Sequence, residues 1–102
     1  MGVSERNVYG EVENESDLKE IYRAIRSEIE SARSRPALTE LYKRAGYLIT
    51  LTHTPAWKKR FGDRIASLRA LGREQFGITA RSVNRRAEQI GVRGDYDETW
   101  GD

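Results

Sequence analysis

Arginine side chains are the groups of this chain that are best suited to bind a ligand. The 102 residues include fourteen arginines and four lysines against sixteen carboxylates, and they include no cysteine. A guanidinium is planar and always charged, and its N–H groups match the geometry of phosphate and carboxylate oxygens. The composition therefore favours anion recognition, although a GC-rich genome would also produce many arginines.

The charges are sorted along the chain. Residues 1–35 carry a net charge of −2 (six basic, eight acidic), residues 36–93 carry +8 (twelve and four), and residues 94–102 carry −4 (none and four). The total of +2 therefore conceals a basic central region between two acidic ends. Because summed charge sets long-range attraction, this pattern predicts a polyanionic partner.

The segment 76–87, Phe-Gly-Ile-Thr-Ala-Arg-Ser-Val-Asn-Arg-Arg-Ala, resembles the turn and second helix of a helix-turn-helix. We expect Gly77 to form the turn and Thr79 to cap a helix over residues 80–90. The side chains predicted to face outward and contact DNA or RNA are Arg81, Ser82, Arg85, Arg86 and Gln89. The pattern departs upstream, where Arg73 stands at a position that usually holds alanine. An ordinary amphipathic helix with a solvated arginine face is the alternative.

A second basic cluster precedes this segment. We expect four of its side chains on the back of a helix, where they would neutralise phosphates without reading bases: Lys58, Lys59, Arg69 and Arg73. Trp57 and Phe61 lie among these charges, as aromatic residues do in proteins that bind single strands. Their i, i+4 spacing places both on an apolar stripe, which favours burial.

Residues 94–102 form an acidic tail that contains two aromatic side chains, Tyr96 and Trp100. The composition favours a mobile, solubilising segment. The alternative is that the tail folds over the basic face and competes with an anionic partner. In that case, deletion of residues 94–102 would strengthen polyanion binding.

The sequence gives little support for catalysis. The single histidine, His53, has no evident acidic or nucleophilic partner near it in sequence, and the glycines match no phosphate-binding loop. The acidic cluster Glu11, Glu13, Glu15 and Asp17 suits the N-terminus of a helix better than a metal. We therefore expect no enzyme, with no catalytic residue, no metal, no cofactor and no small-molecule substrate.

Helical periodicity predicts the elements that position these side chains. We expect four helices, at about residues 15–33, 36–52, 55–76 and 80–90. A strand over residues 47–52 and a helix break at residues 61–63 are the alternatives. The predicted fold class is all-α: a small bundle of three to four antiparallel helices in one domain, 14–93, between a flexible N-terminal arm, 1–13, and the acidic tail.

The apolar stripes of these helices predict a single core. Its expected members are Leu18, Ile21, Ile25, Leu41, Leu48, Trp57, Phe61, Ile65, Leu68 and Val83. No apolar run is long enough to span a membrane and the N-terminus lacks the features of a signal peptide, so we expect a cytoplasmic protein that does not bind membranes.

Two functions are compatible with the charge pattern. The first is nucleic-acid binding, to DNA or RNA, through the basic face of the third and fourth helices. The second is protein interaction, as a homodimer or as the small subunit of a larger complex, in which the acidic first helix of one chain meets the basic helices of another. Phosphate binding weakens steeply with salt, whereas an apolar seam does not.

Overall fold

The computed structural model describes residues 12–101, and the regular structure in this range is entirely helical. The helices are α2 (Glu15–Ile29), α3 (Arg35–Thr52), α4 (Pro55–Phe61) and α5 (Ile65–Gln89), with a 3-10 turn, η1 (Gly62–Arg64), before α5. The prediction of an all-α chain is confirmed for these residues, and residues 47–52 are helical rather than a strand. The predicted flexible arm lies mostly outside the described residues, although Val12 from its end is completely buried.

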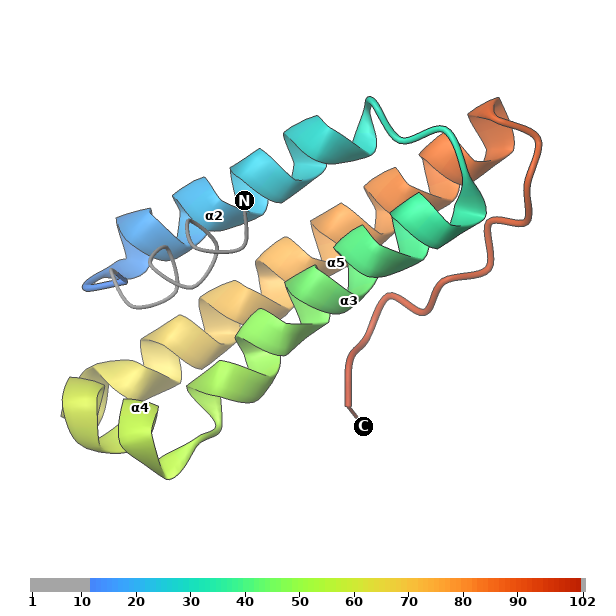
Figure 1. Cartoon of the computed structure of the whole chain (residues 1–102). Helices are drawn as coiled ribbons and strands as arrows, with labels where there is room; N and C mark the ends of the chain where they lie inside the picture. The colour runs from blue at the N-terminus through green and yellow to red at the C-terminus, as the bar shows by residue number, and fades with distance from the viewer. Residues whose placement is uncertain (1–11, 102) are drawn as a thin grey trace.

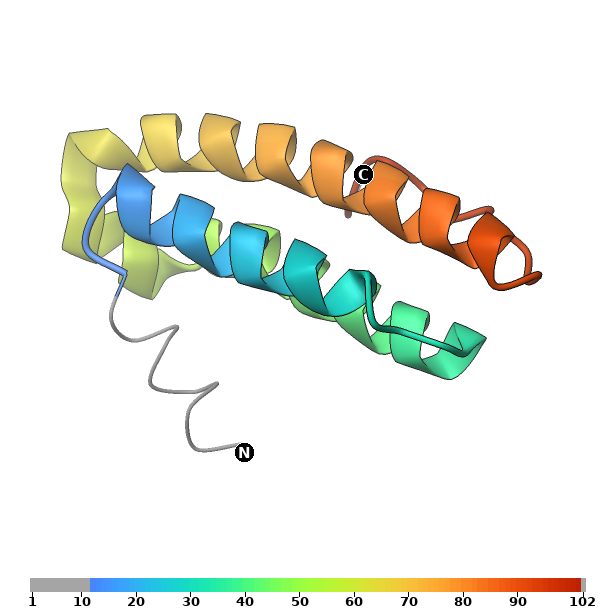
Figure 2. The ribbon, with the colours of Figure 1, turned by 90° about the horizontal axis from the view of Figure 1, so that it is seen from above.

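The three long helices lie side by side, as Figures 1 and 2 show. The chain reverses between α2 and α3, and it reverses again through α4 and η1 before it enters α5. The main packing contacts join α5 to α3 and α5 to α2. Helix α5 therefore has two flanks on which sites can form, one beside α2 and one beside α3.

Side-chain caps fix where the helices begin. Asn14 accepts a hydrogen bond from the backbone N–H of Asp17 at 3.0 Å, and Thr54 accepts one from Trp57 at 3.3 Å. Proline in the first turn of α3 and of α4 suits these starts, because its missing N–H has no intrahelical partner there. The starts of α2 and α4 agree with the predicted helix ranges, whereas α2 ends at Ile29, earlier than the predicted Arg33.

The third predicted helix, over residues 55–76, is broken at Gly62. This glycine has φ +57° and ψ −128°, a backbone conformation that a right-handed helix cannot contain. The backbone then passes through η1 and restarts as α5 at Ile65. The apolar stripe that continues across Gly62 in the sequence therefore belongs to two elements.

The predicted turn at residues 77–79 does not exist, because α5 continues from Ile65 to Gln89. Thr79, which was expected to cap a new helix, is completely buried, and its hydroxyl donates to the carbonyl of Gln75 at 2.8 Å. Val83 is buried as predicted, and together with Ala80 and Ala87 it extends the buried stripe of the preceding turns. The resemblance to a helix-turn-helix therefore fails at the turn, although the inward and outward faces are correct.

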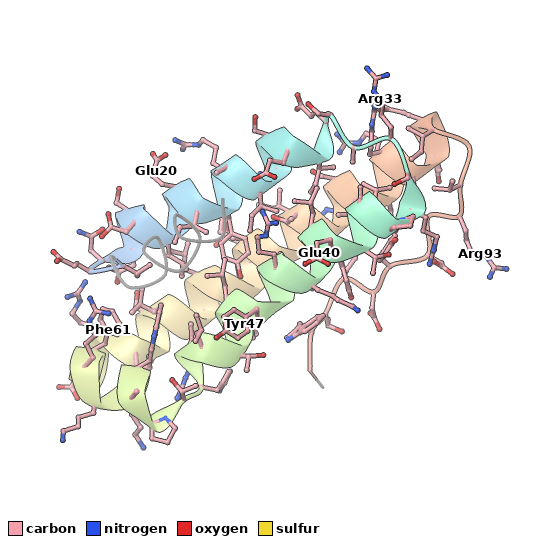
Figure 3. All side chains as sticks on the ribbon, in the orientation of Figure 1. Glu20, Arg33, Glu40, Tyr47, Phe61 and Arg93 are labelled. Carbon is pink, nitrogen blue, oxygen red and sulfur yellow. The ribbon has the colours of Figure 1, made fainter. Side chains whose placement is uncertain are left out.

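The predicted core is buried except for Ile21, which is partly exposed. Tyr22 and Phe76 are the largest completely buried side chains, and the Tyr22 hydroxyl donates to the carbonyl of Ala45 at 3.0 Å. Tyr47 is the one large hydrophobic side chain exposed in residues 12–101, and it lies on α3 (Figure 3). No helix in this range has the length and apolar character needed to cross a membrane.

Residues 92–101 form an ordered segment, which we call the strap. Gly91, with φ +80°, ends α5 with paired bonds from Gly91 N–H to the Glu88 carbonyl and from Val92 N–H to the Ala87 carbonyl. The strap then returns beside α3 and α5 on the side opposite α2 (Figure 1). In the described residues the tail therefore packs on the bundle, as in the predicted alternative that it folds back, because side chains of α3 and α5 form hydrogen bonds with it.

Candidate functional site

A polar groove lies between α2 and the C-terminal half of α5. Its volume is about 540 Å³. We call it the arginine groove; its lining residues are Arg26, Ile29, Glu30, Ile78, Ser82, Arg85, Arg86 and Gln89. Two successive helical turns of α5 supply most of its polar groups because residues three and four apart share a helix face.

Arg26 lies at the inner wall of the arginine groove. Its Nη1 donates to the side-chain oxygens of Gln75 at 3.0 Å and of Thr79 at 3.2 Å, so neutral groups of α5 hold the guanidinium. Partial burial lowers the pKa of Arg26, and the nearby charge of Arg23 lowers it further. A cation in this setting would gain from an anion, since residues 12–101 supply it with only neutral acceptors.

The other two arginines come from α5. Arg86 is half-buried; its Nε donates to the carbonyl of Ala32 at 2.9 Å and its Nη1 to the side-chain oxygen of Gln89 at 3.1 Å. These bonds fix the plane of the guanidinium beside the groove. Arg85 is exposed, and no residue in the range 12–101 forms a hydrogen bond or ion pair with its side chain.

The arginine groove carries an excess of positive charge. Glu30 is the single carboxylate among its lining residues. Within residues 12–101, no carboxylate oxygen lies within 4.0 Å of a guanidinium nitrogen of Arg26, Arg85 or Arg86. A phosphate group suits such a site, because two of its oxygens can accept parallel hydrogen bonds from one guanidinium.

The structure brings four of the predicted nucleic-acid-binding residues together here: Ser82, Arg85, Arg86 and Gln89. The Ser82 hydroxyl donates to the carbonyl of Ile78 at 3.2 Å. Arg26 was not predicted. The sequence does carry a signal for Arg26: it is a charged side chain at the edge of the apolar stripe of α2, between Ile25 and Ile29. A cation in that position needs polar partners from another element.

The other predicted residues lie elsewhere. Lys58 and Lys59 are exposed on α4, and Arg69 caps the end of α3 by donating from Nε to the carbonyl of Thr52 at 2.9 Å. Arg69 and Arg85 are sixteen residues apart on α5, which corresponds to about 24 Å along the helix axis. Arg73 and Arg81 belong to the opposite flank of α5, beside the strap.

That opposite flank is closed by the strap. Asp95 pairs with Arg35 at 3.0 Å, and Glu98 pairs with Arg81 at 3.2 Å. Arg93, at the start of the strap, points outward (Figure 3) and pairs more loosely with Asp95, at 3.6 Å. The guanidinium of Arg35 lowers the pKa of Asp95 by hydrogen bonding and by its charge.

The acidic residues in the first turn of α2 serve the fold. Glu15 accepts from the Ser67 hydroxyl at 2.8 Å and from Arg64 at 3.3 Å, and these bonds lower the pKa of its carboxyl. Asp17 accepts from the backbone N–H of Glu13 at 2.8 Å. In the described part of the chain, no three His, Cys, Asp or Glu side chains group in a way that could hold a metal ion.

Comparisons of the chain with protein-family models, with curated proteins and with solved structures found no match. The function is therefore argued from the geometry of the chain itself.

Proposed function

We propose that this protein binds nucleic acid, and that the arginine groove makes its main phosphate contacts. The observation that carries the proposal is the convergence of Arg26, Arg85 and Arg86 on one groove without a carboxylate partner among the described residues. In this proposal the protein is cytoplasmic and non-enzymatic, and α2, α3 and α5 act as one bundle with α3 antiparallel to its neighbours.

The three arginines have different parts in the proposed contact. Arg85 is exposed and free to reach a phosphate first, whereas Arg86 is already oriented by its bonds to Ala32 and Gln89. Arg26 lies deeper, where partial burial strengthens its attraction for an anion. Ser82 and Gln89 add neutral groups of the kinds that contact phosphates and base edges.

The contact is expected to position the nucleic acid rather than read its sequence. A continuous α5 presents no separate recognition helix, so the base-reading role expected for residues 81–89 has lost its structural basis. Guanidinium–phosphate pairs bind any sequence, and their strength falls steeply with salt. The proposed protein is therefore a binder with little sequence preference.

The test is fluorescence anisotropy of labelled duplex and single-stranded oligonucleotides, titrated with the protein from low to physiological salt. Arg85→Glu is the informative variant because no contact within residues 12–101 depends on that side chain. We expect its affinity to fall by about tenfold or more, and the slope of log K against log salt to fall by about one.

Arg73→Glu is the matched control. It makes the same change of charge on the same helix, but its side chain lies on the flank beside the strap. Duplex affinity is the readout for this control: an equal loss of duplex affinity in both variants would show a diffuse attraction to α5 and would contradict the groove. No binding by the unaltered protein at low salt would contradict nucleic-acid binding altogether.

The alternative function, protein interaction, has weaker support. An apolar homodimer seam needs exposed hydrophobic side chains, and Tyr47 is the one large example in the described range. Tyr22 is completely buried and the strap packs on Tyr42, so neither supplies such a seam. Self-association that survives moderate salt, measured by sedimentation at several protein concentrations, would favour this alternative.

A further inference from the structure

The strap contains both acidic and aromatic side chains. Its sequence from residue 95 is Asp-Tyr-Asp-Glu-Thr-Trp, so carboxylates are interspersed with two rings. A single-stranded nucleic acid offers the same combination, because negative phosphates alternate with flat bases along an extended backbone. The contacts of the strap can therefore be compared with those that such a strand would need.

The carboxylates of the strap occupy positions that phosphates could take. Asp95 pairs with Arg35 on α3 at 3.0 Å, and Glu98 pairs with Arg81 on α5 at 3.2 Å. Both ion pairs are about half-exposed, so water and salt compete with them. Arg73, which lines the cavity beside Glu98 and Trp100, adds a third cation to this flank.

The two rings of the strap pack against rings of the helices in tilted or edge-on orientations. The centroid of Tyr96 lies 4.9 Å from that of Tyr42, and the guanidinium of Arg35 lies 4.8 Å from the centre of the Tyr96 ring. Trp100 lies 5.6 Å from Tyr42 and 5.8 Å from Phe76. Aromatic and guanidinium surfaces of this kind are the platforms on which proteins stack unpaired bases.

Polar side chains of the helices bind the strap between its rings. Asn84 donates to the carbonyl of Tyr96 at 2.9 Å and accepts from its N–H at 2.8 Å. An asparagine amide can make the same paired bonds to the edge of a base. The Tyr42 hydroxyl donates to the carbonyl of Asp97 at 2.9 Å, and the Trp100 indole donates to the Thr50 hydroxyl at 3.1 Å.

We propose that the surface beneath the strap, formed by Arg35, Tyr42, Arg81 and Asn84, is a second nucleic-acid site that accepts a single strand, and that the strap occupies it as an internal mimic. This inference rests on the proposed function and deepens it, since it names single strands as the ligand and the strap as the competitor. The strap must leave before the strand can bind, so the unaltered chain binds single strands below its full capacity.

Gly46 provides a way to displace the strap without altering a charge. The Trp100 ring lies directly against this glycine, and a Cβ at position 46 would overlap the ring. Gly46→Ala therefore pushes Trp100 out, while alanine suits the interior of α3 better than glycine does. Gly72→Ala is the matched control, because a Cβ there meets its nearest neighbour, Ile49, at an ordinary 3.8 Å.

The experiment compares these variants with the unaltered chain in binding a labelled deoxythymidine oligonucleotide of about ten nucleotides and a duplex. We expect Gly46→Ala to bind the single strand about tenfold more tightly. This is the gain expected if the strap-free state, which alone can bind the strand, rises from about one-tenth of the molecules to nearly all of them. Gly72→Ala and the duplex affinity should stay within about twofold of the unaltered values.

Deletion of residues 94–102 removes the strap outright and completes the test. Trp100 fluorescence in a Trp57→Phe background shows whether Gly46→Ala has displaced the ring. A gain in single-strand affinity in the deletion, and also in Gly46→Ala where fluorescence shows that Trp100 has left, supports the proposal. No gain in the deletion, with its helical circular dichroism intact, overturns it; so does no gain in Gly46→Ala once fluorescence shows that Trp100 has left.

Two further outcomes separate this inference from the proposed function. If Arg85→Glu abolishes binding and loss of the strap adds nothing, the arginine groove stands and the second site falls. If the truncated chain binds a peptide of residues 94–102 but gains no affinity for the oligonucleotide, the surface is a protein site and the inference is overturned.

Discussion

The two flanks of α5 carry similar numbers of arginines, but the groups that pair with these arginines differ. Beside the strap, Arg81 meets the carboxylate of Glu98, and Arg35 of the facing helix meets Asp95. Beside α2, the partners of Arg26 and Arg86 in the described part of the chain are amide, hydroxyl and carbonyl oxygens alone. One flank is neutralised by its own chain, and the other retains its charge.

This difference separates structural arginines from candidate functional ones. A cation that is paired within the chain contributes to the fold and offers little to a ligand. Partial burial of a cation that has only neutral acceptors costs desolvation free energy. Cations that lack a charged partner in this way concentrate at functional sites. The distribution of carboxylates is therefore more informative than the distribution of arginines.

The largest expected effect is a loss of oligonucleotide affinity on the α2 flank with little change in stability. Arg26→Met removes the half-buried cation but keeps its volume, so we expect the free energy of unfolding to stay within about 1 kcal/mol. Oligonucleotide affinity should fall by about tenfold, since the deepest cation of the groove is lost. Anisotropy and urea denaturation measure the two quantities. A large loss of stability without a loss of affinity would make Arg26 a structural residue.

The next prediction compares one polar side chain from each flank. Asn84→Ala breaks two hydrogen bonds to the Tyr96 peptide group, and it should lower the free energy of unfolding by about 1 kcal/mol. Ser82→Ala breaks only a bond within α5, and it should change stability by less than about 0.5 kcal/mol. Equal effects in urea denaturation would mean that the strap adds little to the fold.

A smaller effect is expected when one carboxylate is neutralised on each flank. Glu30→Gln removes the lone carboxylate of the arginine groove and should strengthen duplex and single-strand binding by about threefold. Glu98→Gln frees Arg81 and should strengthen only single-strand binding. If the two variants have the same ligand preference, the flanks are not separate sites.

The smallest expected effect is a loosening of the strap in acid. The pKa of Asp95 is lowered from its usual value of 3.8 by Arg35, so its stabilising contribution is present above that value and is lost as the pH falls through the lowered pKa. Trp100 fluorescence in a Trp57→Phe background should report this change below about pH 4. In Arg35→Gln the transition should move to higher pH; an unchanged midpoint would exclude this ion pair as its cause.

Local signals in the sequence were sufficient for most of the helices and the core. Helices α2 and α4 begin where expected, because the caps Asn14 and Thr54 depend on residues only three positions away. The inward-facing positions of α5 follow from the helical period of its apolar residues, and this period continues unchanged through the residues where a turn was wrongly predicted. Gly77 suggested a helix end, yet its surroundings continue the buried stripe, and tertiary packing outweighed the weak helix propensity of one glycine.

Neither the arginine groove nor the strap could be predicted in full, because both depend on contacts between distant residues. Arg26 finds its acceptors 49 and 53 positions later, and Arg35 meets Asp95 after 60. In the sequence, residues 94–102 have the composition of a soluble tail, and nothing local indicates that Gly46 provides room for Trp100. Four of the nine predicted site residues reached one groove because they share a face of α5.

The long sequence separation of the strap contacts has a consequence for the order of folding. The fully buried core contains no residue of the strap, and Val92, Tyr96 and Trp100 pack against it from outside. The strap needs α3 and α5 already side by side before Tyr96 and Trp100 have partners. Segments with few buried contacts and exposed ion pairs open at lower free energy than the core. The strap should therefore be the last part of the chain to fold and the first to open, and the Tyr96 amide should exchange its hydrogen with solvent while the helices stay protected.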